Sequence, residues 1–174
     1  MLAGFFPRWD NARFARLPSL PPAPPMLEEA LLAFVHISAI LTMFVFLTGA
    51  AVLCRGDWLN AAALRRLARV NTLYLACLAI TLLTGLARAW WGVKGWGWYW
   101  GNHLLHVKLL MLMVMMALSI GPARSIARWR AALDAGGALP AAPQVRRARL
   151  LLMVAAHVGT LIPLPAVFMA RGFG

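Results

Sequence analysis

The sequence predicts an all-α integral membrane protein whose helices form a four-helix bundle. Of its 174 residues, 62% are hydrophobic and only 13% are charged, whereas soluble domains average roughly 45–50% apolar and about 25% charged residues. The mean hydropathy is +0.73, which is too apolar for a short soluble chain, since small domains have more surface than interior. Four long apolar stretches follow one another along the chain. In lipid such stretches must be helices, because every backbone group needs an internal partner.

Residues 1–26 differ from the rest and are predicted to form an N-terminal strap. The first half mixes aromatic and basic residues, which is typical of a segment lying at a membrane surface. The second half is rich in proline, which favours a stiff, extended chain. A secretory signal needs an apolar run of about 7–15 residues, and none is present here.

Residues 27–174 are predicted to form the four-transmembrane-helix domain. Its spans are expected at about 27–54, 70–91, 103–121 and 150–170. Each can provide the roughly 20 residues that a bilayer requires. Gly121-Pro122 is expected to end the third span, and Pro163 and Pro165 to kink the fourth, because proline cannot donate a helical hydrogen bond.

The basic residues predict the orientation. The chain has 17 Lys and Arg against 5 Asp and Glu, a net charge of +12. Two loops hold most of the arginines: Arg55, Arg65, Arg66 and Arg69 between the first two spans, and Arg124, Arg128, Arg130, Arg146, Arg147 and Arg149 between the last two. Basic loops stay in the cytoplasm, so we expect a multi-pass protein of the bacterial inner membrane with both termini on the non-cytoplasmic side.

The excess of basic residues does not indicate nucleic-acid binding. No basic stripe carries the exposed aromatic residues of a nucleic-acid-binding module, so no nucleic acid is expected as a partner.

The second span carries a polar stripe. Its members follow the 3–4 spacing of a packed helix: Asn71, Tyr74, Leu78, Thr81, Gly85 and Arg88. Polar side chains inside a membrane face the protein interior. The stripe indicates either a packing seam between helices or a polar path that leads to Arg88.

A second set of polar residues lies toward the outer ends of the spans. At 1.5 Å per residue, His36 and His106 share the outer half of the membrane, roughly 10 Å and about 6 Å from its edge. Two histidines can hold haem b, with Met43 as an alternative ligand, and Arg88 and Lys108 can pair with its propionates. The alternatives are histidines that bond to nearby hydroxyl or carbonyl groups, and cations that extend toward the headgroups.

Several other chemistries have no signal in the sequence. There is no glycine-rich phosphate loop, no HExxH or CxxC spacing, and no carboxylate deep within a span. Hydrolysis and carboxylate-based proton pumping are therefore disfavoured, and whether the protein is an enzyme stays open.

Cys54 and Cys77 are expected to remain unpaired, because they fall at different depths in the membrane. The tryptophan-rich segment 90–100 indicates an aromatic belt or a surface that stacks a pigment or a partner helix.

The chain resembles an uncharacterised family of small four-helix bacterial membrane proteins, a domain of unknown function. The motifs that carry this resemblance are Phe34-Val35-His36, Leu64-Arg65-Arg66-Leu67-Ala68-Arg69, Thr84-Gly85-Leu86-Ala87-Arg88, Gly92-x-Lys94-Gly95, Tyr99, Asn102, Lys108 and Met169-Ala170-Arg171-Gly172. More distantly, His36-Ile37 and His106-Val107-Lys108-Leu109 resemble the HemJ-type protoporphyrinogen oxidases. That resemblance implies a four-helix protein that binds haem b, with His36 as a ligand and Lys108 as a site residue.

Two functions follow as hypotheses. The first is a redox or electron-transfer protein that binds haem b between helices one and three. The second is a non-catalytic accessory subunit of a larger respiratory or photosynthetic membrane complex, docked through the N-terminal strap onto other membrane subunits. A third, a carrier of small anions or lipophiles, lacks the inverted repeat of known carriers.

Overall fold

The structure is a computed structural model that describes residues 26–92 and 94–174. Its elements in this part of the chain are helices: α1 Met26–Leu53, the 3₁₀ turn η2 Gly56–Trp58, α2 Ala61–Trp91, α3 Trp96–Gly101, α4 His103–Asp134, α5 Ala142–Leu161 and α6 Pro163–Ala170. Four stretches are long and apolar enough to cross a membrane, α5 and α6 together forming the last. The predicted all-α fold with four membrane-spanning helices is confirmed. The predicted strap lies outside the described residues.

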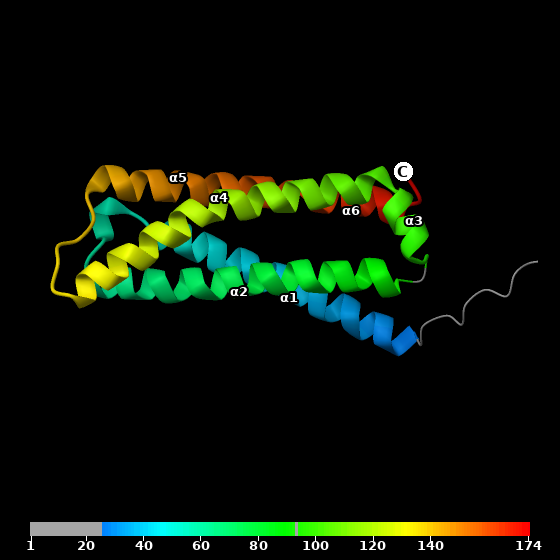
Figure 1. Ribbon diagram of the computed structural model, residues 1–174, viewed down its shortest axis with the longest axis horizontal. Helices are drawn as coiled ribbons and strands as arrows, with labels where there is room; N and C mark the ends of the chain where they lie inside the picture. The colour runs from blue at the N-terminus through cyan, green and yellow to red at the C-terminus, as the bar shows by residue number, and fades with distance from the viewer. Residues whose placement is uncertain (1–25, 93) are drawn as a thin grey trace, which may run out of the picture.

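The four long helices form an elongated bundle (Figure 1). Helix α1 packs mainly along α2, and α4 packs mainly along α5. Contacts between α2 and α4 and between α1 and α5 close the bundle, so α1 and α4 lie on a diagonal with little direct contact. We call the end that holds α3 the tryptophan end, and the end that holds η2 and the α4–α5 loop the basic end.

The helices extend further toward the basic end than the apolar spans indicated. The prediction that Gly121-Pro122 ends the third span is wrong, because α4 continues to Asp134 with Pro122 buried inside it. Proline lacks a backbone N–H group, so one helical hydrogen bond is missing at its position. The packed helix tolerates the loss of this one bond. Helix α2 begins at Ala61, where the side chain of Asn60 accepts a hydrogen bond from the Ala63 amide at 2.9 Å. Hydropathy marks the part of a helix that lipid surrounds, and it does not mark where the helix ends.

The fourth span shows the predicted effect of proline. Helix α5 ends at Leu161, and α6 begins at Pro163. At the other end of this span, α5 starts at Ala142, earlier than the expected residue 150. Helices α2 and α4 contain 31 and 32 residues, about 46 and 48 Å at 1.5 Å per residue. A hydrocarbon layer is about 30 Å thick, so both helices are longer than a single crossing needs.

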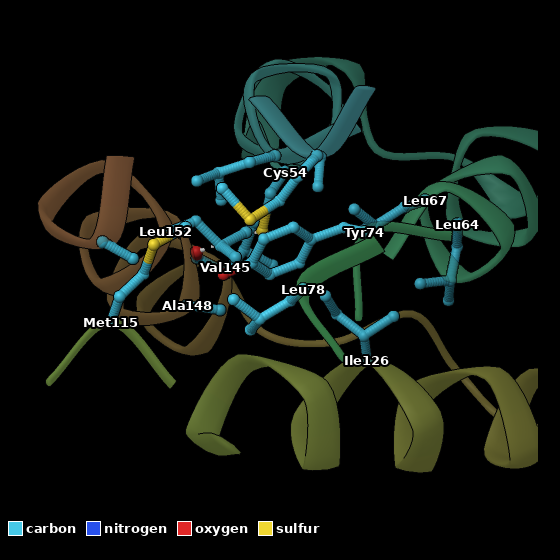
Figure 2. Close-up of a cluster of buried hydrophobic side chains, with 14 of the residues drawn as sticks. Cys54, Leu64, Leu67, Tyr74, Leu78, Met115, Ile126, Val145, Ala148 and Leu152 are labelled. Atoms are coloured by element: carbon cyan, nitrogen blue, oxygen red, sulfur yellow. Dashed lines mark hydrogen bonds between the residues drawn. The ribbon is translucent and has the colours of Figure 1, made fainter. Parts of the chain in front are cut away.

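The buried core occupies the middle of the bundle and its basic end (Figure 2). Its members are Met43, Leu47, Ala50, Cys54, Leu64, Leu67, Tyr74, Leu78, Leu112, Met115, Ile126, Val145, Ala148, Leu152 and Ala155. The Tyr74 hydroxyl lies 2.6 Å from Ser119 Oγ, and Ser119 donates to the Met115 carbonyl at 2.8 Å. A hydroxyl has one proton, so Tyr74 is the donor to Ser119. The stripe predicted on the second span is confirmed as a packing seam from Asn71 to Thr81, where its members are buried.

The half of the bundle near the tryptophan end is packed more loosely. No residue of α1 before Met43 belongs to the core cluster, and many of its apolar side chains there are exposed, Phe34 by 68%, although Ala39 is buried. Toward its N-terminus, α1 diverges from α4 and α5 (Figure 1) but stays beside α2, where His36 packs against Gly85. The polar residues proposed as a site lie in this open half.

Candidate functional site

His36 is held against α2 by a hydrogen bond to Thr84. Its Nδ1 atom lies 2.8 Å from Thr84 Oγ1, and Thr84 Oγ1 donates its proton to the Ile80 carbonyl at 2.7 Å. Because the hydroxyl has only one proton to give, it must accept from His36. The imidazole therefore carries a proton on Nδ1, and in its neutral form Nε2 keeps a lone pair that can bind a metal.

Gly85 provides the space that the imidazole occupies. A Cβ atom built at Gly85 would lie 3.2 Å from Cε1 of His36, closer than almost all real contacts of this kind. The ring is thus packed on the backbone of α2, one residue beyond its hydrogen-bond partner. This close approach needs a glycine at this position.

Two cations join His36 in the open half. The charges of Arg88 on α2 and Lys108 on α4 both act on the His36 ring, and the charge of Arg88 also acts on Lys108. Within the part of the chain that the structure describes, neither cation lies within 4.0 Å of a carboxylate oxygen; the ion pairs found there involve other arginines. The structure thus places His36, Arg88 and Lys108, from three helices, in the same region of the open half.

A small pocket adjoins this group at the tryptophan end. It has a volume of about 190 Å³, and its lining comes from α1 and the end of α2: Glu28, Glu29, Leu32, Arg88, Trp91 and Gly92. Tyr99 packs beside it, since a Cβ at Gly92 would lie 2.8 Å from the Tyr99 hydroxyl oxygen. Burial raises the pKa of Tyr99 above its ordinary value, Arg88 opposes this rise, and Glu29 adds to it. The sequence pattern alone gave neither Tyr99 nor Glu29 a role in a site.

The other histidines lie apart from this group. His106 is exposed, its Nδ1 donates to the Asn102 carbonyl at 3.2 Å, and its ring meets Trp100 edge to face at 5.3 Å. His157 is also exposed and donates to the Met153 carbonyl at 2.7 Å.

Met43 is buried in the core, and only 2% of its surface is exposed. It lies seven residues from His36, which corresponds to about 10 Å along the helix. Its thioether is packed among apolar side chains and does not join the group around His36.

The tryptophan-rich segment forms a stacked surface. Trp90 and Trp96 have ring centroids 4.9 Å apart, and Trp96 stacks on Trp100 at 5.1 Å. Next to them, buried Asn102 accepts from the Leu104 amide at 2.9 Å and donates to the Phe173 carbonyl at 3.1 Å. Asn102 thereby caps α4 and ties the C-terminal residues to this end. An asparagine directly before an apolar span is the signal that could have predicted the cap.

The donor set suits a cofactor better than a bare metal ion. In the described residues, no three His, Cys, Asp or Glu side chains converge on one point. A bare ion such as zinc needs three or four such ligands, whereas the iron of haem takes four from its porphyrin and needs only one or two from the protein. The two cysteines are unpaired, as expected.

Comparison with known families agrees with the fold. A family model described as "Predicted membrane protein (DUF2214)" matches residues 28–174. No curated protein and no solved structure matches the chain. The resemblance to HemJ-type oxidases is therefore not shown by these comparisons, and haem binding remains a proposal.

Proposed function

This chain belongs to the family of predicted membrane proteins DUF2214, and we propose that it binds haem b in the open half of its bundle, with His36 as the axial ligand. The observation that carries the proposal is the bond from His36 to Thr84, which is also the bond to a nearby hydroxyl that the sequence offered as the alternative; the proposal differs from that alternative in giving the free Nε2 a ligand. This bond holds the imidazole in the tautomer with a proton on Nδ1 and a lone pair on Nε2. Haem-ligating histidines need this arrangement, in which a hydrogen bond at one nitrogen orients the other toward the metal.

The charges near His36 support an anionic cofactor. Haem b carries two propionates, and arginine and lysine are their usual partners. Arg88 and Lys108 come from different helices and act on the same ring. Two cations next to a neutral histidine would repel a free metal cation, but they would attract a porphyrin that carries carboxylates.

The pocket beside Arg88 is too small to hold a large cofactor. The pocket of about 190 Å³ beside Arg88 is smaller than the roughly 300–1,000 Å³ of small-molecule sites. The proposal therefore does not place the porphyrin inside that pocket.

When bound, haem b would supply one-electron transfer within the membrane. Thr84 would set the tautomer and the direction of His36, and Gly85 would keep the ring close to α2. Arg88 and Lys108 would hold the anionic edge.

The test is an absorption spectrum of the full chain purified from a host that supplies haem. We expect a reduced-minus-oxidised spectrum typical of haem b, lost in His36→Ala and kept in His157→Ala, a matched control on the exposed face of α5. A further variant, His106→Ala, should change the spin state if His106 provides the second ligand. A folded wild-type protein without haem absorbance, or His36→Ala with full absorbance, would overturn the proposal.

A second candidate is the accessory subunit of a larger membrane complex. One observation favours it: His157 and Thr160 are exposed on an apolar span, whereas polar side chains in membranes almost always face protein. A partner helix on this face would cover them. Gentle solubilisation should then retain a larger complex that His157→Leu dissociates and Leu150→Ala, on an exposed residue of the same helix, leaves intact. An unchanged complex in both variants would argue against this surface.

A further inference from the structure

A second pocket lies at the basic end, between α4 and α5. Its volume is about 550 Å³, within the range of small-molecule sites. Its polar lining comprises Arg124, Ser125, Arg128, Trp129, Gln144 and Arg147. Three arginines thus border one cavity, together with a hydroxyl, an amide and an indole.

These three arginines have no acidic partner in the part of the chain that the structure describes. The carboxylate of Asp134 is engaged by Arg130 at 2.8 Å and by Arg65 at 3.6 Å. The remaining ion pair there joins Arg55 to Asp57. Arg124, Arg128 and Arg147 therefore leave their positive charge around the pocket uncompensated, which favours an anionic ligand.

The pocket has a polar rim and an apolar floor. Pro122, Ala148 and Leu151 form the apolar part, and Pro122 and Ala148 are buried. Gln144 lies in the first turn of α5, whose start has no side-chain cap. The positive end of that helix adds to the attraction for an anion.

The depth of the pocket matches the surface of a bilayer. From the start of α4 to Gly121 the helix rises about 27 Å at 1.5 Å per residue. A hydrocarbon layer is about 30 Å thick. A helix that starts at one surface therefore reaches the opposite headgroups near Gly121, where this pocket begins, and Arg128 lies about two turns beyond.

We propose that this pocket binds the phosphate of an anionic phospholipid, with the arginines on the headgroup and the glycerol and upper acyl chain on the apolar floor. Basic pockets between transmembrane helices suit such headgroups, and arginine binds phosphate oxygens in a bidentate manner. A free phosphate has the same anionic chemistry but no use for the apolar floor. The proposal is independent of the haem site, which lies at the other end of the molecule.

The test titrates the purified full-length protein with defined lipids in mixed micelles and measures bound lipid by native mass spectrometry. Phosphatidylglycerol should bind saturably, and zwitterionic phosphatidylcholine should bind at least tenfold more weakly. The double variant Arg128→Gln/Arg147→Gln should lower the affinity for phosphatidylglycerol by about fivefold per arginine, from the energy of a basic residue near an anionic surface.

The control variant is Arg66→Gln/Arg146→Gln, which removes the same charge from the basic end without touching the pocket lining. It should bind phosphatidylglycerol as the wild type does. Equal weakening in both double variants would show diffuse attraction and overturn the site. Inorganic phosphate that competes with the lipid at equal affinity would overturn the assignment to a lipid, and absence of saturable binding would overturn the proposal as a whole.

Discussion

The two halves of this bundle differ in how they use their helices. Toward the basic end, all four long helices contribute to one buried core with Tyr74 at its centre (Figure 2). Toward the tryptophan end, α1 diverges from α4 and α5 (Figure 1), and the polar residues His36 and Arg88 are only partly buried. The packed half therefore stabilises the fold, while the open half holds the polar side chains proposed as a site.

The largest effect should come from one pair of leucines on α1. Leu47 is fully buried in the packed half, whereas Leu41, less than two turns away, is 63% exposed. Leu47→Ala leaves a cavity and should lower the free energy of unfolding by about 2–5 kcal/mol. Leu41→Ala should change it by about 0.5 kcal/mol or less. Unfolding in mixed detergent micelles measures both, and equal losses would remove the distinction between the halves.

The next effect concerns Cys54, which belongs to the packed half. Burial raises the pKa of its thiol from 9.0 to about 11. The thiolate is the reactive form and is lost below the pKa, so at pH 8 its fraction falls about a hundredfold relative to an ordinary cysteine. Maleimide labelling of the Cys77→Ser protein should therefore be slow at pH 8 and faster as the pH rises toward 11. Ala61→Cys in a Cys54→Ser/Cys77→Ser background provides the exposed control, and equally fast labelling of Cys54 would contradict its burial.

A third prediction tests the open half through Gly85. The added methyl of Gly85→Ala would meet the His36 ring and push it away from Thr84. Stability should change by no more than about 1 kcal/mol, since alanine favours the helix, but the haem spectrum should be weakened or shifted. Gly49→Ala is the control, because its methyl would make an ordinary 3.5 Å contact with Val70. An unaltered spectrum in Gly85→Ala would show that the position of the ring does not matter.

The smallest effect is expected for Tyr74→Phe. It removes the 2.6 Å hydrogen bond to Ser119 and leaves the apolar packing of the ring in place. Ser119 still donates to the Met115 carbonyl, so the loss should be only about 1 kcal/mol in unfolding free energy. A loss as large as that of Leu47→Ala would mean that polar bonds rather than packing stabilise this half.

Much of the fold could be predicted from the chain, because each span is visible on its own. Apolar length predicts the four crossings, and the 3–4 spacing of the stripe on α2 predicts the seam that contains Tyr74 and Thr81. The ends were harder. Arginine-rich turns are good helix formers in water, so hydropathy could not show that α4 continues past Pro122.

The site was predictable only in part, because depth along a helix does not show which helices face one another. Depth along the spans pairs His36 with His106, whose Nδ1 donates to the Asn102 carbonyl. The partner of His36 proved to be Thr84 on α2, with Gly85 making room for the ring. Nor could the sequence show that Arg124, Arg128 and Arg147 border one cavity, since they come from two helices joined by a loop.

The sequence by itself determined the class of the protein, the number of its crossings and the end that carries its positive charge. These properties depend on hydropathy and charge summed over neighbouring residues, and such sums need no knowledge of tertiary contacts. Only the tertiary structure decided which half is packed and which is open, and which cations gather around His36 or around the pocket at the basic end. Those properties depend on distances between helices, and one helix can be rotated or tilted against another without any change in the sequence pattern of either.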